Sequence, residues 1–81
     1  EELYMVTLEQ IKSKFQEVVR EAIKYSKLTQ SEISRRIGVK PQTMSDYLKG
    51  KILPAFDTFA NLCKVLDLDP VEILCLNDKN S

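Results

Sequence analysis

The chain has 81 residues and carries 12 basic and 12 acidic side chains, so its formal net charge at pH 7 is zero. A chain of this length forms one small domain that buries about 60–65% of the surface of its unfolded state, and 43% hydrophobic residues suffice for a core without disulfides. The sequence contains no histidine, no glycine-rich phosphate loop and no spaced cysteine cluster. These absences argue against the usual nucleophile–base pairs, P-loops and zinc sites, so we expect no enzymatic activity, no cofactor and no metal.

Cys63 and Cys75 are too few for a disulfide framework, and both stand among apolar neighbours. We expect them to be packing residues of the core or of an interface rather than reactive thiols. No apolar run approaches the ~20 residues of a membrane span, and no signal peptide is visible. The sequence therefore favours a cytoplasmic protein without a membrane partner.

Residues 1–6 are expected to form a lead-in to a first helix that starts at Thr7 and ends near Tyr25. Apolar residues recur at helical spacing along this stretch and predict one buried face. They are Leu8, Ile11, Phe15, Val18, Val19, Ala22 and Ile23.

A capping pattern occurs three times along the chain. In each case an apolar residue precedes a residue with a capping side-chain oxygen, Gln or Glu follows three positions later, and Ile follows at the fourth. This is a capping box with a hydrophobic staple. It predicts three helix starts, which are Val6-Thr7-x-x-Gln10-Ile11, Leu28-Thr29-x-x-Glu32-Ile33 and Leu68-Asp69-x-x-Glu72-Ile73.

The stretch from residue 29 to residue 49 predicts two short helices joined by a tight turn. Ile33 and Ile37 lie four positions apart and give the first helix a buried stripe. Gly38 follows where a helix that must end needs a residue tolerant of positive φ. Pro41 opens the second helix at its first position, where the missing N–H costs nothing. Two helices joined by so short a turn form the helix-turn-helix pattern, whose second helix can enter the major groove of DNA. The buried side of that second helix is predicted to hold Met44, Tyr47 and Leu48.

The helix that begins at Pro41 differs from the three capped helices. It has the staple pair Val39 and Met44, but Lys40 stands where the capping oxygen is expected. Its first N–H groups therefore have no side-chain partner. Two interpretations are open: water satisfies an exposed helix end, or the N–H groups, the positive end of the dipole and Lys40 together bind phosphate.

After Gly50 a connector leads through Pro54 to a fourth helix. Its core face is predicted to consist of Phe56, Phe59, Ala60, Leu62, Cys63 and Leu66. A fifth, short helix follows Asp69 and Pro70 and holds Val71, Ile73 and Leu74. We expect one domain with a folded core at residues 7–76 and a polar tail at 77–81 that frays.

The charges are unevenly distributed although their sum is zero. Residues 1–27 carry five basic and five acidic side chains. Residues 28–53, which include the helix-turn-helix, carry a net charge of +3, and residues 54–81 carry −3. This polarity favours contact between the helix-turn-helix and a nucleic acid, although +3 is a weak electrostatic anchor.

Several residues resemble, in type and order, the phage-repressor family of helix-turn-helix domains, the lambda repressor and Cro-like or XRE-type proteins. The resemblance covers roughly residues 8–76. It implies an all-α, five-helix lambda-repressor-like fold and a sequence-specific transcriptional regulator, expected to be a repressor, that binds a double-stranded DNA operator and is associated with the nucleoid. The residues that carry it are Leu28, Thr29, Gln30, Glu32, Ile33, Ile37, Gly38, Val39, Met44, Gly50, Lys51, Pro54, Phe59, Leu62, Leu66, Leu68 and Ile73.

A single domain of this kind offers few base contacts, so we expect a homodimer that reads two half-sites about one helical turn, roughly 34 Å, apart. The dimer surface is expected around Val71, Leu74, Cys75 and Leu76. Two other functions remain open, because the same fold serves as the antitoxin of a toxin–antitoxin pair and as a protein-interaction module that no longer binds DNA. Both would imply a protein partner.

The family places its base-reading residues near the start of the second motif helix, and these positions are here Lys40, Pro41, Gln42, Ser45 and Asp46. Gln42 is the strongest candidate, because its amide can pair with adenine N6 and N7. Ser45 can bond to more than one base, and Pro41 offers only apolar contact. Asp46 departs from expectation, since phosphates repel a carboxylate unless it accepts from cytosine N4 or discriminates against other bases. Contacts to phosphate are expected from Gln30, Thr43, Lys49 and Lys51.

The sequence also departs from the family inside the core. The family often joins its first helix to the end of the recognition helix with a buried Arg–Glu ion pair, and the matching positions here are Ile23 and Leu48. An apolar pair avoids the desolvation of two charges. We therefore expect Ile23 and Leu48 to be buried and in contact.

Overall fold

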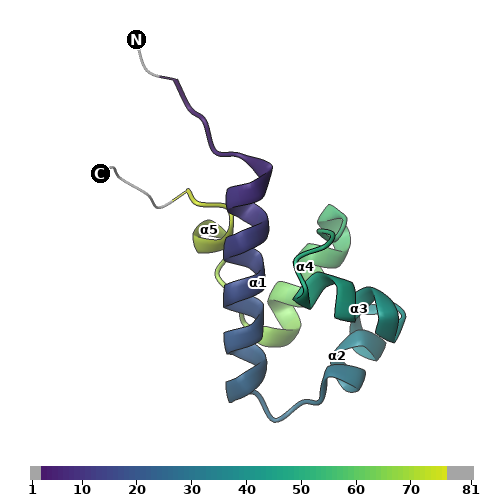
Figure 1. The fold of residues 1–81 in the computed structure, drawn as a ribbon. Coiled ribbons are helices and arrows are strands. Elements are labelled where there is room, and N and C mark those ends of the chain that lie inside the picture. Colours follow the sequence, from purple (N-terminus) through teal and green to yellow (C-terminus); the bar gives the residue numbers. More distant parts are fainter. Residues whose placement is uncertain (1–2, 77–81) are drawn as a thin grey trace.

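A computed structural model describes residues 3–76 of the chain, and these residues form helices and loops without a β-strand. The order of helices is α1 (Leu8–Tyr25), α2 (Gln30–Ile37), α3 (Pro41–Leu48), α4 (Phe56–Leu66) and α5 (Pro70–Ile73). Figure 1 shows α1 as the long helix, with α5 beside it and α2, α3 and α4 grouped along one side. The expected all-α, five-helix architecture is confirmed. The first two residues of the lead-in and the polar tail at 77–81 lie outside the described residues.

The side-chain caps explain why α1 and α2 begin where they do. Thr7 Oγ1 accepts a hydrogen bond from the N–H of Gln10 at 3.2 Å, and the side chain of Gln10 accepts one from the N–H of Thr7 at 2.8 Å. Thr29 and Glu32 form the same reciprocal pair at 3.0 and 3.2 Å. Two of the three predicted capping boxes are therefore present.

The third predicted capping box is wrong in its detail. Asp69 does cap α5, but its carboxylate accepts from the N–H of Val71, the second residue of the helix, at 3.0 Å. Glu72 is exposed and does not complete a reciprocal box. Because α5 has only four residues and Pro70 supplies no N–H, one bond from Asp69 satisfies its first free donor.

The turn between α2 and α3 has the predicted geometry. Gly38 adopts a left-handed conformation with φ 76° and ends α2, a conformation that costs a residue with a Cβ atom about 1–2 kcal/mol. The N–H of Val39 then donates to the carbonyl of Ser34 at 2.9 Å. Pro41 occupies the first turn of α3, as expected. The chain therefore passes from α2 into α3 through only three residues.

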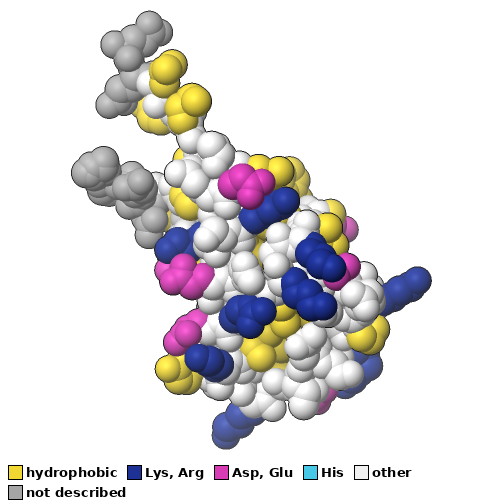
Figure 2. All heavy atoms as spheres, viewed as in Figure 1, with side chains coloured by type: hydrophobic (Ala, Val, Ile, Leu, Met, Phe, Trp, Pro, Cys, Tyr) yellow, Lys and Arg dark blue, Asp and Glu magenta, His cyan; other side chains and the backbone are white. Residues whose placement is uncertain are grey.

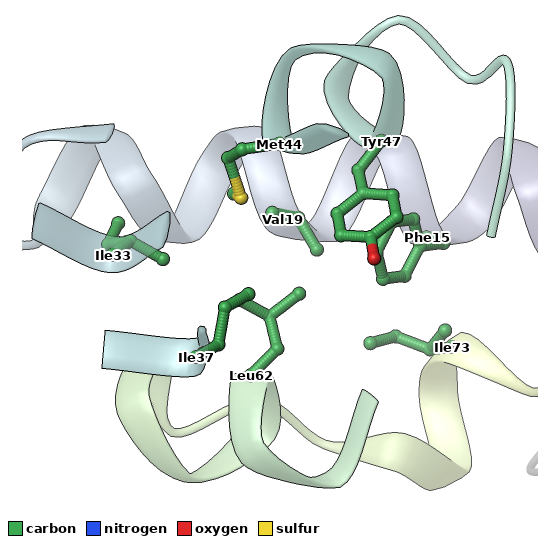
Figure 3. Packing of buried hydrophobic residues seen from close by; sticks show 8 residues of the cluster. All are labelled: Phe15, Val19, Ile33, Ile37, Met44, Tyr47, Leu62 and Ile73. Carbon is green, nitrogen blue, oxygen red and sulfur yellow. The ribbon is translucent and has the colours of Figure 1, made fainter. Parts of the chain in front are cut away.

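The core lies where α1, α2, α3 and α4 converge, with α5 closing one end (Figure 3). The Phe15 ring meets the Tyr47 ring edge-on, with centroids 6.1 Å apart, and lies 6.2 Å from the Phe59 ring. These aromatic contacts join α1 to α3 and α4 and add specific geometry to the burial of apolar area. The buried hydrophobic residues are Phe15, Val19, Ile33, Ile37, Met44, Tyr47, Leu62 and Ile73.

Three residues assigned to the core by their spacing are exposed instead. Phe56 is 91% exposed and Leu8 is 59% exposed, and Ala60 is also in the exposed class. Phe56 and Leu8 are the first residues of their helices. Helical spacing identifies which face of a helix is apolar, but it does not show where the neighbouring helix that covers this face ends. The buried side of α4 is carried by Leu62, with Phe59, Cys63, Val65 and Leu66 half-buried beside it.

Ile23 and Leu48 are half-buried rather than buried, and both pack against the core cluster. The contact between them stays a prediction. A polar link that the sequence analysis missed joins the same two helices. The Nε–H of Arg20 on α1 donates to the carbonyl of Leu48, the last residue of α3, at 2.9 Å. A cation at this end also interacts favourably with the negative end of the α3 dipole.

Candidate nucleic-acid interface

The first residues of α3 are exposed to solvent, while the inward side of the helix anchors it in the core. Lys40, Pro41 and Gln42 are exposed. Met44 is 0% exposed and Tyr47 is 4% exposed, and both lie in the core. Among the residues predicted to read bases, helical periodicity places Gln42, Ser45 and Asp46 on the side of α3 away from Met44 and Tyr47.

The start of α3 lacks a side-chain cap, as predicted. Lys40 is the N-cap residue, with φ −73° and ψ 151°, and its side chain makes no capping hydrogen bond. Its carbonyl accepts from the N–H of Met44 at 3.1 Å, so the helical ladder itself begins normally. Pro41 has no N–H, which leaves the N–H groups of Gln42 and Thr43 as the donors at this end. The arrangement offers two N–H groups and one lysine charge to an anion.

Two of the predicted base-reading residues are joined to each other. The Nε2 of Gln42 donates to the Oδ1 of Asp46, four residues later on α3, at 3.1 Å. Residues four apart on a helix are neighbours on its surface, and a Gln–Asp pair at this spacing contributes about 0.2–0.5 kcal/mol to the helix. Gln42 is exposed and Asp46 is half-buried. The spacing of four residues between Gln42 and Asp46 is the sequence signal that indicates this pair.

The remaining predicted contacts lie around the same face or at its ends. Ser45 and Thr43 are half-buried on α3, so less of each is offered to a ligand than of Gln42. Gln30 is the exposed first residue of α2, which packs against α3. Lys49 and Lys51 are exposed at the carboxyl end of α3. Gly50, with φ 75°, turns the chain between them.

Lysine and arginine side chains occupy much of the face that carries α1 and α3. Figure 2 shows them spread over α1 and toward α3, with fewer carboxylates among and beside them. The net charge of zero therefore coexists with a face on which positive side chains predominate. Such a face attracts a polyanion at low ionic strength, and salt screens the attraction.

Two groups behind this face have altered acidities. Burial raises the pKa of the Tyr47 hydroxyl, and the charge of Asp57 raises it further. Burial also raises the pKa of the Cys63 thiol, with a second contribution from Asp69. Both shifts favour the neutral form of the group. A protonated Cys63 agrees with its expected role as a packing residue, since the thiolate is the reactive form.

Among residues 3–76, no three acidic, cysteine or histidine side chains lie together in a way that could hold a metal ion. In the same part of the chain, every helix is too short or too polar to cross a lipid bilayer.

Comparison with known proteins places this geometry in a family. A family model described as helix-turn-helix matches residues 19–73, which include the whole of α2, α3 and α4. Among solved structures, the chain is similar to the SOS-response transcriptional repressor LexA from Eubacterium rectale, with 31% sequence identity and a TM-score of 0.73. The similarity covers 86% of this chain and 73% of that one. A search of curated proteins gave no match. The chain therefore belongs to the phage-repressor-like, XRE-type helix-turn-helix family of DNA-binding transcriptional regulators.

Proposed function

We propose that the protein is a sequence-specific repressor that places α3 in the major groove of double-stranded DNA. The observation that carries this proposal is the division of α3 into an exposed face and a buried anchor. Gln42 is exposed near the start of the helix, and Met44 and Tyr47 fix the helix in the core. In helix-turn-helix proteins the residues near the start of the second helix contact base edges. The similar LexA chain is described as a transcriptional repressor, which supports repression over activation.

In this proposal, some residues of the interface recognise bases and others bind phosphate. Gln42 pairs with a base, with Lys40, Pro41, Ser45 and Asp46 beside it. Phosphate contacts come from both ends of the motif and fix its register on the duplex without reading sequence. The phosphate-binding residues are Gln30, Thr43, Lys49 and Lys51.

The test begins with a selection from random double-stranded DNA, followed by binding isotherms on the selected operator and on a scrambled duplex. Gln42→Ala is expected to weaken operator binding by about 1–3 kcal/mol and to relax the base preference at one position per half-site. Lys49→Ala and Lys51→Ala are expected to weaken both duplexes alike and to lower the salt slope by about one unit each. If Gln42→Ala weakened binding to both duplexes equally, Gln42 would not be a base-reading residue. Absence of salt-dependent binding to any duplex would refute the DNA-binding proposal.

We also propose that the protein acts as a homodimer through an apolar end of the molecule. The lead-in at residues 3–6 and the chain at Cys75 and Leu76 line one open hollow beside the start of α1. Leu3 is 82% exposed and Leu76 is 65% exposed, and the other lead-in residues are exposed as well. Apolar side chains gathered in this way mark an interaction surface. A second copy would bury them, together with Val71 on α5 and Leu74, the residue that follows α5.

Sedimentation equilibrium tests the dimer directly. The parent protein is expected to dimerise, and Leu76→Asp is expected to shift it to monomer because the substitution buries an unpaired charge in the interface. Ile52→Asp is the matched control, because Ile52 is an exposed apolar residue in the connector between α3 and α4. It should leave the dimer intact. A parent protein that stays monomeric at all concentrations would contradict the proposal, and the apolar end would then favour a different protein partner, such as the toxin of an antitoxin pair.

A further inference from the structure

We propose that Asp46 is a positioning residue that makes Gln42 select adenine and reject guanine. The inference rests on the proposed role of Gln42 as a base reader and adds a reason for its specificity. The observation behind it is the hydrogen bond of 3.1 Å from Gln42 Nε2 to Asp46 Oδ1. It assigns Asp46 a role other than the direct reading of cytosine that its position alone had suggested.

The chemistry of the carboxylate fixes which way round the glutamine amide lies. A glutamine amide has a carbonyl oxygen that only accepts and an NH2 group that only donates, and exchanging the two by rotation costs little when the surroundings allow either. An ionised carboxylate only accepts, so it holds the NH2 group and repels the carbonyl oxygen. Asp46 therefore favours one of the two amide orientations at Gln42. This preference follows from the donor and acceptor types of the two side chains alone.

The fixed orientation matches one purine better than the other. With one N–H held by Asp46, the Gln42 amide has one N–H and one carbonyl oxygen left to offer. Adenine presents an acceptor at N7 and a donor at N6, which pair with these two groups. Guanine presents acceptors at both N7 and O6. Pairing with guanine would require two free N–H groups, or would bring the carbonyl oxygen of Gln42 against O6.

This role predicts that affinity and selectivity move in opposite directions. The charge of Asp46 is repelled by phosphates on every duplex, whatever its sequence. Removing the charge should therefore strengthen binding to scrambled DNA. The same change frees the Gln42 amide to rotate, which should reduce the preference for adenine over guanine. A residue that acted only as a surface charge would change the first quantity and leave the second unchanged.

The variant Asp46→Asn tests the inference with little change in shape. Its amide can accept from or donate to Gln42, so both orientations become available. The operator position to examine is the one at which Gln42→Ala relaxes the preference of the parent. Duplexes with adenine or guanine at that position are compared by equilibrium binding. The adenine-to-guanine affinity ratio is expected to fall about tenfold, within the range of a bidentate pair, while affinity for scrambled DNA rises.

Two controls separate this mechanism from others. Asp67→Asn removes one charge at the end of α4, where asparagine also tolerates the left-handed conformation of Asp67, and it should leave the ratio unchanged. In a Gln42→Ala background, Asp46→Asn should no longer alter the ratio, because no amide remains to be positioned. A ratio that still changes there, or one that is unchanged in the single variant, would overturn the inference. Sequence-specific binding by the parent would leave the proposed function standing in both cases, whereas binding to no duplex would refute the function itself.

Discussion

Lys40→Ser would give α3 the cap that α1 and α2 already have. Lys40 has the extended backbone of an N-cap residue, with φ −73° and ψ 151°, close to the φ −81° and ψ 160° of Thr29. A serine oxygen at this position can therefore accept from the N–H of Thr43, as Thr29 accepts from Glu32 at 3.0 Å. Lys40 is exposed, so its truncation removes no core contact.

The expected gain in the free energy of unfolding is ~0.5–1 kcal/mol, the lower part of the range for N-caps, because water already reaches this exposed helix end. For a domain of this size the gain corresponds to a rise in Tm of roughly 2–8 °C. Thermal unfolding followed by circular dichroism measures it. Lys40→Ala removes the charge without supplying the oxygen, so the difference between the serine and alanine variants isolates the cap. Thr29→Ala tests the reverse change, because it removes an existing cap, and should lower the free energy of unfolding by ~1 kcal/mol.

The same substitution should weaken binding to DNA. The serine oxygen would occupy one N–H group that phosphate would otherwise accept from, and the lysine charge would be lost. Binding to operator and to scrambled duplex should both fall, since phosphate contacts carry no sequence information. Equal stability of the serine and alanine variants would refute the capping argument. Unchanged DNA affinity in a stabilised variant would show instead that only water binds this helix end.

The remaining predictions concern stability and the thiols. Arg20→Ala should lower the free energy of unfolding by about 0.5–1 kcal/mol in urea denaturation, because it removes the hydrogen bond to the Leu48 carbonyl. The control is Arg36→Ala, at an exposed position on α2, which should change the free energy of unfolding by less than about 0.5 kcal/mol. Gly38→Ala should cost about 1–2 kcal/mol from backbone conformation alone, since no atom lies within 4 Å of the added Cβ; a smaller loss for Gly38→Ala than for Gly38→Asn would contradict this. Burial and Asp69 raise the pKa of Cys63, so its alkylation at a pH of roughly 8.5 should be slower in the folded chain than in denaturant. The stabilising contribution of Cys63 should be complete below the pKa of the unfolded thiol and be lost as the pH rises through the higher pKa of the folded state. The oligomeric state should also be the same with and without reductant, and a dimer that dissociates only on reduction would instead indicate a disulfide between chains.

The parts of the fold that the sequence predicted are those governed by local chemistry. Thr7 and Thr29 cap their helices through short contacts within one turn. Gly38 and Pro41 act through their own backbone preferences. The absence of a cap at Lys40 follows from the identity of this one side chain, which has no oxygen to accept a hydrogen bond. Each of these features depends on residues close together in the chain, so one sequence suffices to identify them.

The parts that the sequence did not predict depend on where distant segments meet. The bond from Arg20 to the Leu48 carbonyl joins residues 28 positions apart. The exposure of Phe56 follows from how far the neighbouring helices extend along α4, which periodicity does not encode. The Gln42–Asp46 bond is the exception, because it is local and the spacing of four residues on one helix is enough to indicate it.

The contacts that hold α3 in place are separate from the residues that it displays. Met44 and Tyr47 fix the helix in the core, and Arg20 holds its carboxyl end, while Lys40 and Gln42 lie in solvent. Substitutions at the displayed positions change the chemistry of the surface at little cost in stability. During evolution, such a domain can be retargeted to a new sequence through a few surface substitutions while the fold is retained. Chains with nearly identical cores can therefore control different genes.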